Sequence, residues 1–60
     1  MTVLEVVKKY DLANFSKHYE NIFGEDRDLL PINDLMNMEV KSISLNFFIR
    51  TATITIATFH

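Results

Sequence analysis

The stretch Thr-Ala-Thr-Ile-Thr-Ile-Ala, residues 51–57 of an alternating segment that extends to Phe59, decides the fold of this 60-residue chain. Alternation with a period of two is typical of a β-strand, and it places the isoleucines on one face and the threonines on the other. The stretch has high β-propensity and no charge, proline or glycine, a composition typical of strand edges that pair with further strands. We therefore predict an outer strand through which two copies of the chain share one sheet, formed by Thr53, Ile54, Thr55 and Ile56.

A second alternating stretch, residues 41–45, precedes this one and predicts a half-buried strand. If the two stretches were one strand they would be out of phase, because Ile49 and Ile54 differ in parity. A break between Asn46 and Arg50 removes this conflict and predicts an antiparallel hairpin. The turn contains no Asn-Gly or similar pair, so a continuous bulged strand that crosses a dimer is the alternative.

The N-terminal half has helical signals. Thr2-Val3-Leu4-Glu5 fits a capping box, and Val3, Leu4, Val7 and Tyr10 fall on one side of a first helix. Apolar spacings of three and four between Leu12 and Phe23 predict a second helix, capped by Asp11 and ended by Gly24, or else one bent helix. Pro31 fits the first turn of a third helix that ends near Met38, with its inward face formed by Ile32, Leu35 and Met36.

These elements predict an α+β fold in which two or three N-terminal helices pack on a C-terminal antiparallel β-hairpin, within a single domain of residues 1–60. A core of this size supplies roughly 3–5 kcal/mol, so small domains usually need an additional source of stability. The chain has no cysteine and therefore no disulfide. We expect a homodimer whose sheet is extended by the second copy.

The residue inventory argues against catalysis and cofactor binding. Gly24 is the only glycine, so there is no glycine-rich phosphate loop, and the only imidazoles belong to His18 and His60. The acidic residues within 25–28 resemble a fragment of a calcium loop, but the remaining ligands are missing at the required spacing. We predict that the protein is not an enzyme and holds no cofactor or metal.

The charge distribution argues against nucleic acid and membrane partners. The formal net charge is −2 and residues 20–39 are strongly acidic, whereas DNA binding requires a basic surface. Residues 42–60 approach the length of a membrane span, but Arg50 lies inside the stretch at a cost of about 2.5–3.5 kcal/mol. We expect a cytoplasmic protein, with an acidic surface that favours a basic protein partner.

The most informative residues for function are Phe47, Phe48, Ile49 and Arg50, which lie at the predicted turn. Turn residues are usually small and polar, whereas aromatic residues and arginine are typical of binding hot spots. We predict a non-catalytic protein that regulates or inhibits a partner of unknown identity by surface contact, of a kind typical of phages and mobile elements. The alternatives are a small DNA-binding regulator with a helix-turn-helix-like pair of helices, or a structural subunit that is stable only in an assembly.

Overall fold

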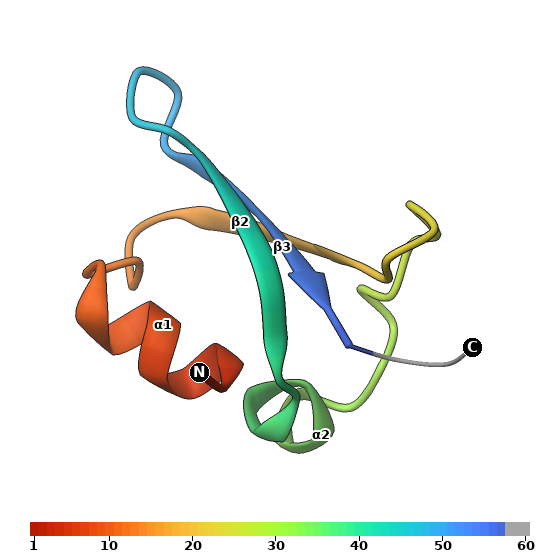
Figure 1. Ribbon diagram of the computed structural model, residues 1–60. Helices are drawn as coiled ribbons and strands as arrows, with labels where there is room; N and C mark the ends of the chain where they lie inside the picture. The colour runs from red at the N-terminus through yellow and green to blue at the C-terminus, as the bar shows by residue number, and fades with distance from the viewer. Residues whose placement is uncertain (58–60) are drawn as a thin grey trace.

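The computed structural model describes residues 1–57, which form two helices and one three-stranded sheet (Figure 1). In chain order the elements are α1 (Val3–Lys9), β1 (Ser16–Glu20), α2 (Ile32–Asn37), β2 (Val40–Asn46) and β3 (Thr51–Ile56). The α+β class is therefore confirmed. The predicted continuation of the last strand to Phe59, and the imidazole of His60, lie outside the described residues.

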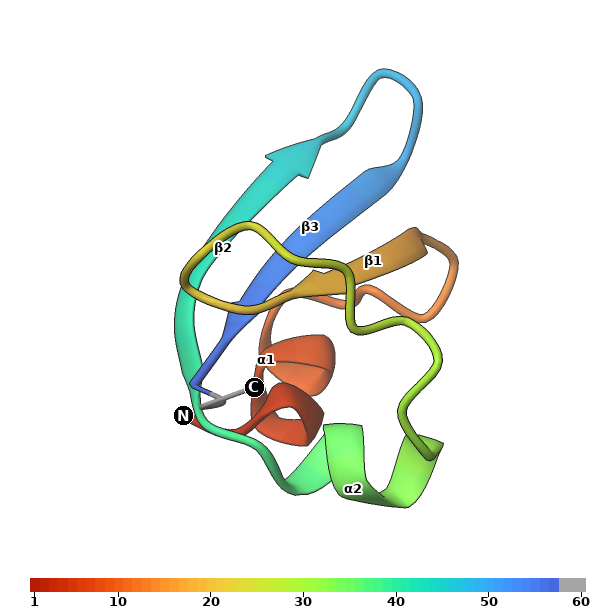
Figure 2. The same cartoon turned by 90° about the vertical axis from the view of Figure 1, so that its right-hand side faces the viewer.

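The last strand in the chain is the central strand of the sheet, whose order is β1–β3–β2 (Figure 2). β3 pairs in parallel with β1, with Ser16 opposite Thr51, and in antiparallel fashion with β2, with Asn46 also opposite Thr51. The prediction that Thr53–Ile56 is an outer strand is therefore wrong. Both edges of this strand already have neighbours within the same chain, because a third strand lies where the sequence spacing predicted a helix.

That third strand, β1, corrects the helix predicted between Leu12 and Phe23. Tyr19 and Lys17, two positions apart, lie on the inward face of β1, and Tyr19 is buried there. The Lys17 ammonium donates to the carbonyls of Leu12 at 2.9 Å and Phe15 at 2.8 Å. The lysine thus occupies a position where strand periodicity calls for an apolar side chain, with its stem along the core and its charge at the margin. A helix-turn-helix would need a second helix at this position, so that arrangement is not present among residues 1–57.

The two residues predicted to bound the second helix lie in turns instead. Asp11 has a φ of 54° and follows the end of α1, and Gly24 has a φ of 80° and donates its N–H to the carbonyl of Asn21 at 3.0 Å. Gly24 does adopt the left-handed conformation that glycine permits, but in a loop rather than at a helix end.

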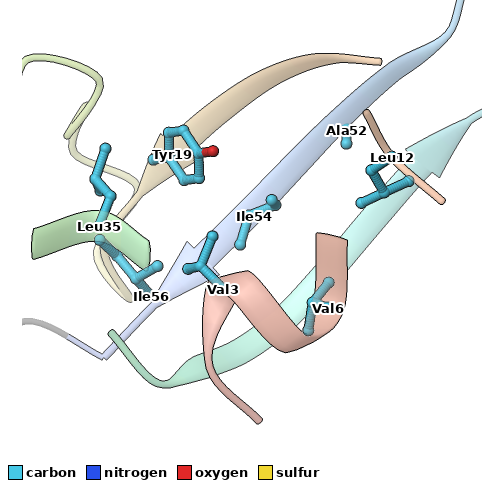
Figure 3. Packing of buried hydrophobic residues seen from close by; sticks show 8 residues of the cluster. All are labelled: Val3, Val6, Leu12, Tyr19, Leu35, Ala52, Ile54 and Ile56. Atoms are coloured by element: carbon cyan, nitrogen blue, oxygen red, sulfur yellow. The ribbon is translucent and has the colours of Figure 1, made fainter. Parts of the chain in front are cut away.

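The core lies between the helices and one face of the sheet (Figure 3). Ile54 and Ile56 are fully buried and point toward the helices, and the threonines that alternate with them are half-buried on the other face. Within residues 1–57, the buried apolar residues all belong to this one cluster: Val3, Val6, Leu12, Tyr19, Leu35, Ala52, Ile54 and Ile56. The alternation read from the sequence is therefore correct, although the position of the strand in the sheet is not.

The capping box predicted for the first helix is present at the start of α1. The N–H of Glu5 donates to Thr2 Oγ1 at 3.3 Å, and the N–H of Thr2 donates to Glu5 Oε1 at 2.8 Å. The predicted inward stripe is only partly correct: Val3 is buried and Val7 is half-buried, but Leu4 and Tyr10 are each 43% exposed, and the second buried residue is Val6, which the stripe did not include. The face that α1 turns to the sheet is therefore centred on Val3 and Val6 rather than on the predicted stripe.

The short helix α2 follows Pro31, which is its N-cap rather than a residue of its first turn. The helix ends at Asn37 with Met38 as its C-cap, in agreement with the predicted end near Met38. Leu35 is buried and Met36 is half-buried, but Ile32 is 59% exposed and does not face inward. No helix in residues 1–57 combines the length and apolar character needed to cross a membrane.

Candidate partner-binding site

The turn between β2 and β3, Phe47–Arg50, projects beyond the helices at one end of the molecule (Figures 1 and 2). Asn46 orders this turn, because its Oδ1 accepts the N–H of Phe48 at 3.0 Å and the N–H of Ile49 at 3.3 Å. An asparagine side chain that accepts from the backbone two and three residues on is a recognised turn-forming device. Arg50 completes the turn with a left-handed φ of 54°. The turn is thus well defined without an Asn-Gly pair.

Three consecutive large apolar side chains on this turn face solvent: Phe47 is 70% exposed, Phe48 is 96% exposed and Ile49 is 61% exposed. Among the described residues, the aromatic neighbour of this turn is Phe15, whose ring meets that of Phe47 edge to face with 5.7 Å between centroids. Folding of the described residues does not bury Phe48 at all. The structure therefore places the four residues singled out from the sequence together on one exposed turn.

The turn is also attached to the strand that flanks it. The N–H of Ser16 donates to the carbonyl of Arg50 at 2.9 Å, so β1 begins beside the end of the turn. The C-terminal end of α1, which carries Lys8 and Lys9, lies on the same side of the molecule, whereas loop 21–30 lies on the opposite side (Figure 1). The turn and the C-terminal end of α1 therefore lie toward one end of the molecule, and a further exposed aromatic residue, Phe23 (73% exposed), belongs to loop 21–30 at the other.

At the opposite end, the acidic loop completes the free edge of β1. Asp28 Oδ1 accepts the N–H of Tyr19 at 2.6 Å, and the N–H of Arg27 donates to the carbonyl of Tyr19 at 2.8 Å. Asp28 Oδ2 lies 2.8 Å from Nδ1 of His18, and Asp26 Oδ1 accepts the N–H of Asp28 at 2.7 Å. The loop therefore supplies the partners that a fourth strand would otherwise provide.

The pair formed by His18 and Asp28 has shifted protonation equilibria. The hydrogen bond to Asp28 raises the pKa of His18 above its usual value of 6.5. For Asp28, partial burial acts to raise the pKa, but the hydrogen bonds from the Tyr19 N–H and from His18 outweigh it, and the net pKa lies below 3.8. Both side chains are about 40% exposed. His18 lies within the helix that the sequence predicted between Leu12 and Phe23. Its contact with Asp28 joins residues ten positions apart, and such a contact has no signal in local periodicity.

Three side chains of this network, His18, Asp26 and Asp28, hold potential metal-ligand atoms within 4.8 Å of one another. Both carboxylate oxygens of Asp28 and one of Asp26 already bond to groups of the protein. Glu25, which the sequence grouped with these aspartates, accepts instead from Nδ2 of Asn21 at 2.8 Å. The contacts of these groups are those of a network that fixes the loop against β1.

A surface hollow of about 490 Å³ lies next to this network and is lined by Asp26, Arg27, Leu29 and Leu30. Leu29 is 99% exposed, which the sequence did not predict. The hollow lies in the loop, and Leu30 in its wall packs against the apolar core.

The segment predicted for the dimer sheet, Thr53–Ile56, does not form a common surface. Its isoleucines are enclosed in the chain's own core, and its threonines are half-buried on the opposite face of the sheet. Of the two segments predicted from the sequence as contact surfaces, the turn lies together at the surface and Thr53–Ile56 does not.

No protein-family model matches the chain, and comparisons with curated proteins and with solved structures also find no match.

Proposed function

We propose that this chain is a non-catalytic protein that acts by binding another protein, and that the turn Phe47–Arg50 is its contact surface. The observation that carries the proposal is Phe48, which is 96% exposed at an ordered, projecting turn between two exposed apolar neighbours. Contiguous apolar groups on the surface of a small domain indicate interaction sites.

The turn has the chemistry and the rigidity of a binding anchor. Aromatic residues and arginine dominate the energy of protein interfaces, and Phe47, Phe48 and Arg50 supply both kinds of residue within four positions. The two hydrogen bonds to Asn46 fix the backbone before any partner arrives, which lowers the entropy lost on binding. The partner site that fits is an apolar pocket with an acidic rim, since Arg50 is the charged residue of the turn.

The test uses a photo-crosslinking phenylalanine analogue at position 48, expressed in the native host, to identify the protein that contacts the turn. With that partner purified, Phe48→Ala is expected to weaken binding about 30-fold or more, corresponding to a hot spot of about 2 kcal/mol. The circular dichroism of the variant is expected to match that of the wild type, because this side chain is solvent-exposed.

The matched control is Leu29→Ala, which removes an equally exposed apolar side chain from the acidic loop at the other end of the molecule. It is expected to bind normally. Equal loss in both variants, or no loss in Phe48→Ala, would contradict the proposal. Exclusive capture of a second copy of the chain would favour the structural-subunit alternative.

A further inference from the structure

We propose that two copies of the chain pair through the open edge of β2, in antiparallel fashion, about a two-fold axis at Ser44. The contact joins their sheets into one of six strands. This surface differs from the turn that carries the proposed function, and it replaces the β3 contact that the sequence indicated.

The hydrogen bonds of β3 show which backbone groups of β2 have no backbone partner within residues 1–57. The carbonyl of Arg50 accepts from the N–H of Ser16, so the backbone N–H and C=O of residue 50 are directed toward β1. This direction alternates from one residue to the next along a strand. The backbone N–H and C=O groups of the odd-numbered residues of β3 are therefore directed toward β2. The N–H of Ala57, which donates to the carbonyl of Glu39 at 2.8 Å, agrees with this phase.

The same phase holds across the pairing of the two strands. Ser44 is opposite Thr53 and Asn46 is opposite Thr51, so the backbone groups of Ser44 and Asn46 point inward to β3. Ile43 precedes Ser44, and Leu45 lies between Ser44 and Asn46. The backbone N–H and C=O groups of Ile43 and Leu45 therefore point away from β3, toward the open edge of the sheet. These two residues offer two donors and two acceptors to an incoming strand.

The open stretch has two definite ends. Upstream, the N–H of Val40 donates to the carbonyl of Met1 at 2.7 Å, so the N-terminal residues already cover the edge there. A shift in register between Val40 and Ser42 then separates this covered part from the rest of the strand. Downstream, the chain leaves the strand after Asn46 and enters the turn. The open stretch is Ser42–Asn46, and its midpoint is Ser44.

A second copy fits this stretch because the stretch is complementary to itself. With Ser44 opposite Ser44 of the second copy, Ile43 lies opposite Leu45 of the second copy, and Leu45 lies opposite Ile43 of the second copy. Each of these two pairs forms two backbone hydrogen bonds, so the contact has four. The side chains of Ile43 and Leu45 are half-buried at the margin of the core, and this pairing places them side by side across the junction. Lys41 falls opposite position 47 of the second copy, so the two lysines do not oppose each other.

Other registers use the edge less well. If Ile43 were opposite Ile43 of the second copy, Asn46 would lie opposite Val40, whose N–H is already bonded to Met1. If Leu45 were opposite Leu45 of the second copy, Ile43 would lie opposite Phe47, where the strand has ended. Only the register centred on Ser44 matches the whole open stretch of one copy to the whole open stretch of the other.

The test is a disulfide between identical positions in a chain that has no natural cysteine. In the proposed register Ser44 forms a non-hydrogen-bonded pair with its own copy, with a Cα separation of about 4.5 Å, which lies at the lower end of the range of disulfides. Ser44→Cys is expected to form a covalent dimer nearly completely under mild oxidation at tens of micromolar. Sedimentation of the reduced variant and of the wild-type protein is expected to show dimers.

The matched control is Ser42→Cys, a serine on the same strand face that lies opposite Asn46 of the second copy rather than opposite itself. Alone it is expected to remain uncrosslinked, whereas the double variant Ser42→Cys/Asn46→Cys is expected to crosslink like Ser44→Cys. The double variant also gives a second reading if Ser44→Cys disturbs folding, which circular dichroism reports.

A wild-type monomer at tens of micromolar would overturn the proposal, as would equal crosslinking of Ser42→Cys and Ser44→Cys. Adding Phe48→Ala to Ser44→Cys is expected to leave crosslinking unchanged. Loss of crosslinking in that double variant would show that the turn itself is the dimer contact, and would also overturn the β2 pairing. A failure of the proposed function would leave the crosslinking result unaffected.

Discussion

Asp28 holds the free edge of β1 in place of a neighbouring strand, and its replacement tests this role directly. One carboxylate oxygen accepts the N–H of Tyr19 at 2.6 Å, and the other lies 2.8 Å from Nδ1 of His18. Asp28→Ala removes both contacts, whereas Asp28→Asn keeps an oxygen for Tyr19 and removes only the charge. The two variants therefore separate the backbone contact from the ion pair.

The expected magnitudes follow from these contacts. Loss of a charged acceptor from the partly buried N–H of Tyr19 costs about 1.5–3 kcal/mol, and loss of the exposed pair with His18 costs about 0.2–1 kcal/mol. Asp28→Ala is thus expected to lower the free energy of unfolding by about 2–3 kcal/mol, and Asp28→Asn by about 0.5–1 kcal/mol. Since 1 kcal/mol shifts Tm by about 4–8 °C in a domain of this size, Asp28→Ala is expected to melt about 10–20 °C lower.

The assay is thermal and urea unfolding followed by circular dichroism, together with an NMR titration of His18. Asp34→Asn, which removes the same charge from an exposed position in α2, is the control and is expected to change stability by less than about 0.5 kcal/mol. In Asp28→Asn the pKa of His18 is expected to fall toward its usual value. If Asp28→Ala and Asp28→Asn were equally stable, or if both matched the control, the carboxylate would not be replacing a strand neighbour.

Two further predictions concern pH and the core. The pair formed by His18 and Asp28 makes its full contribution to the free energy of unfolding between pH 3.8 and 6.5, which are the usual pKa values of Asp28 and His18. This contribution is lost as pH rises through the raised pKa of His18, and it is also lost as pH falls through the lowered pKa of Asp28. Urea titrations are expected to show maximal stability within this window, with a decline of about 0.2–1 kcal/mol at higher pH that is absent in His18→Gln. Ile54→Val, at a fully buried site in the central strand, is expected to cost about 0.5–1.5 kcal/mol, whereas Thr53→Val on the opposite face should change stability by no more than about 0.5 kcal/mol; equal effects would contradict the assignment of the buried face.

The parts of the fold that depend on local chemistry were predictable from the sequence. The capping box of Thr2 and Glu5 and the start of α2 directly after Pro31 depend on neighbouring residues alone. The alternation in residues 51–56 correctly identified Ile54 and Ile56 as the buried side of a strand. The position of the exposed turn followed from the change of parity between the two alternating stretches.

The remaining part of the fold depends on a contact between distant segments. β1 contains one large apolar residue, Tyr19, and its other inward position is Lys17. The apolar residues therefore show no period of two here, and the spacings of three and four between Leu12 and Phe23 predict a helix instead. This segment forms a strand because it pairs in parallel with β3. The paired residues, such as Ser16 and Thr51, are 35 positions apart in the sequence. The same contact moves β3 from the edge to the centre. The ion pair of His18 with Asp28 depends on this arrangement, and so it could not be predicted either.

The central position of β3 has a consequence for synthesis of the protein. Neither β1 nor β2 pairs with the other, and each reaches the sheet only through residues 51–56. A nascent chain that lacks residues 51–56 therefore has no two strands that pair with each other in the native sheet. Folding of the sheet must follow translation of residues 51–56, and a message truncated before this segment would yield a product without a sheet, exposed to proteolysis.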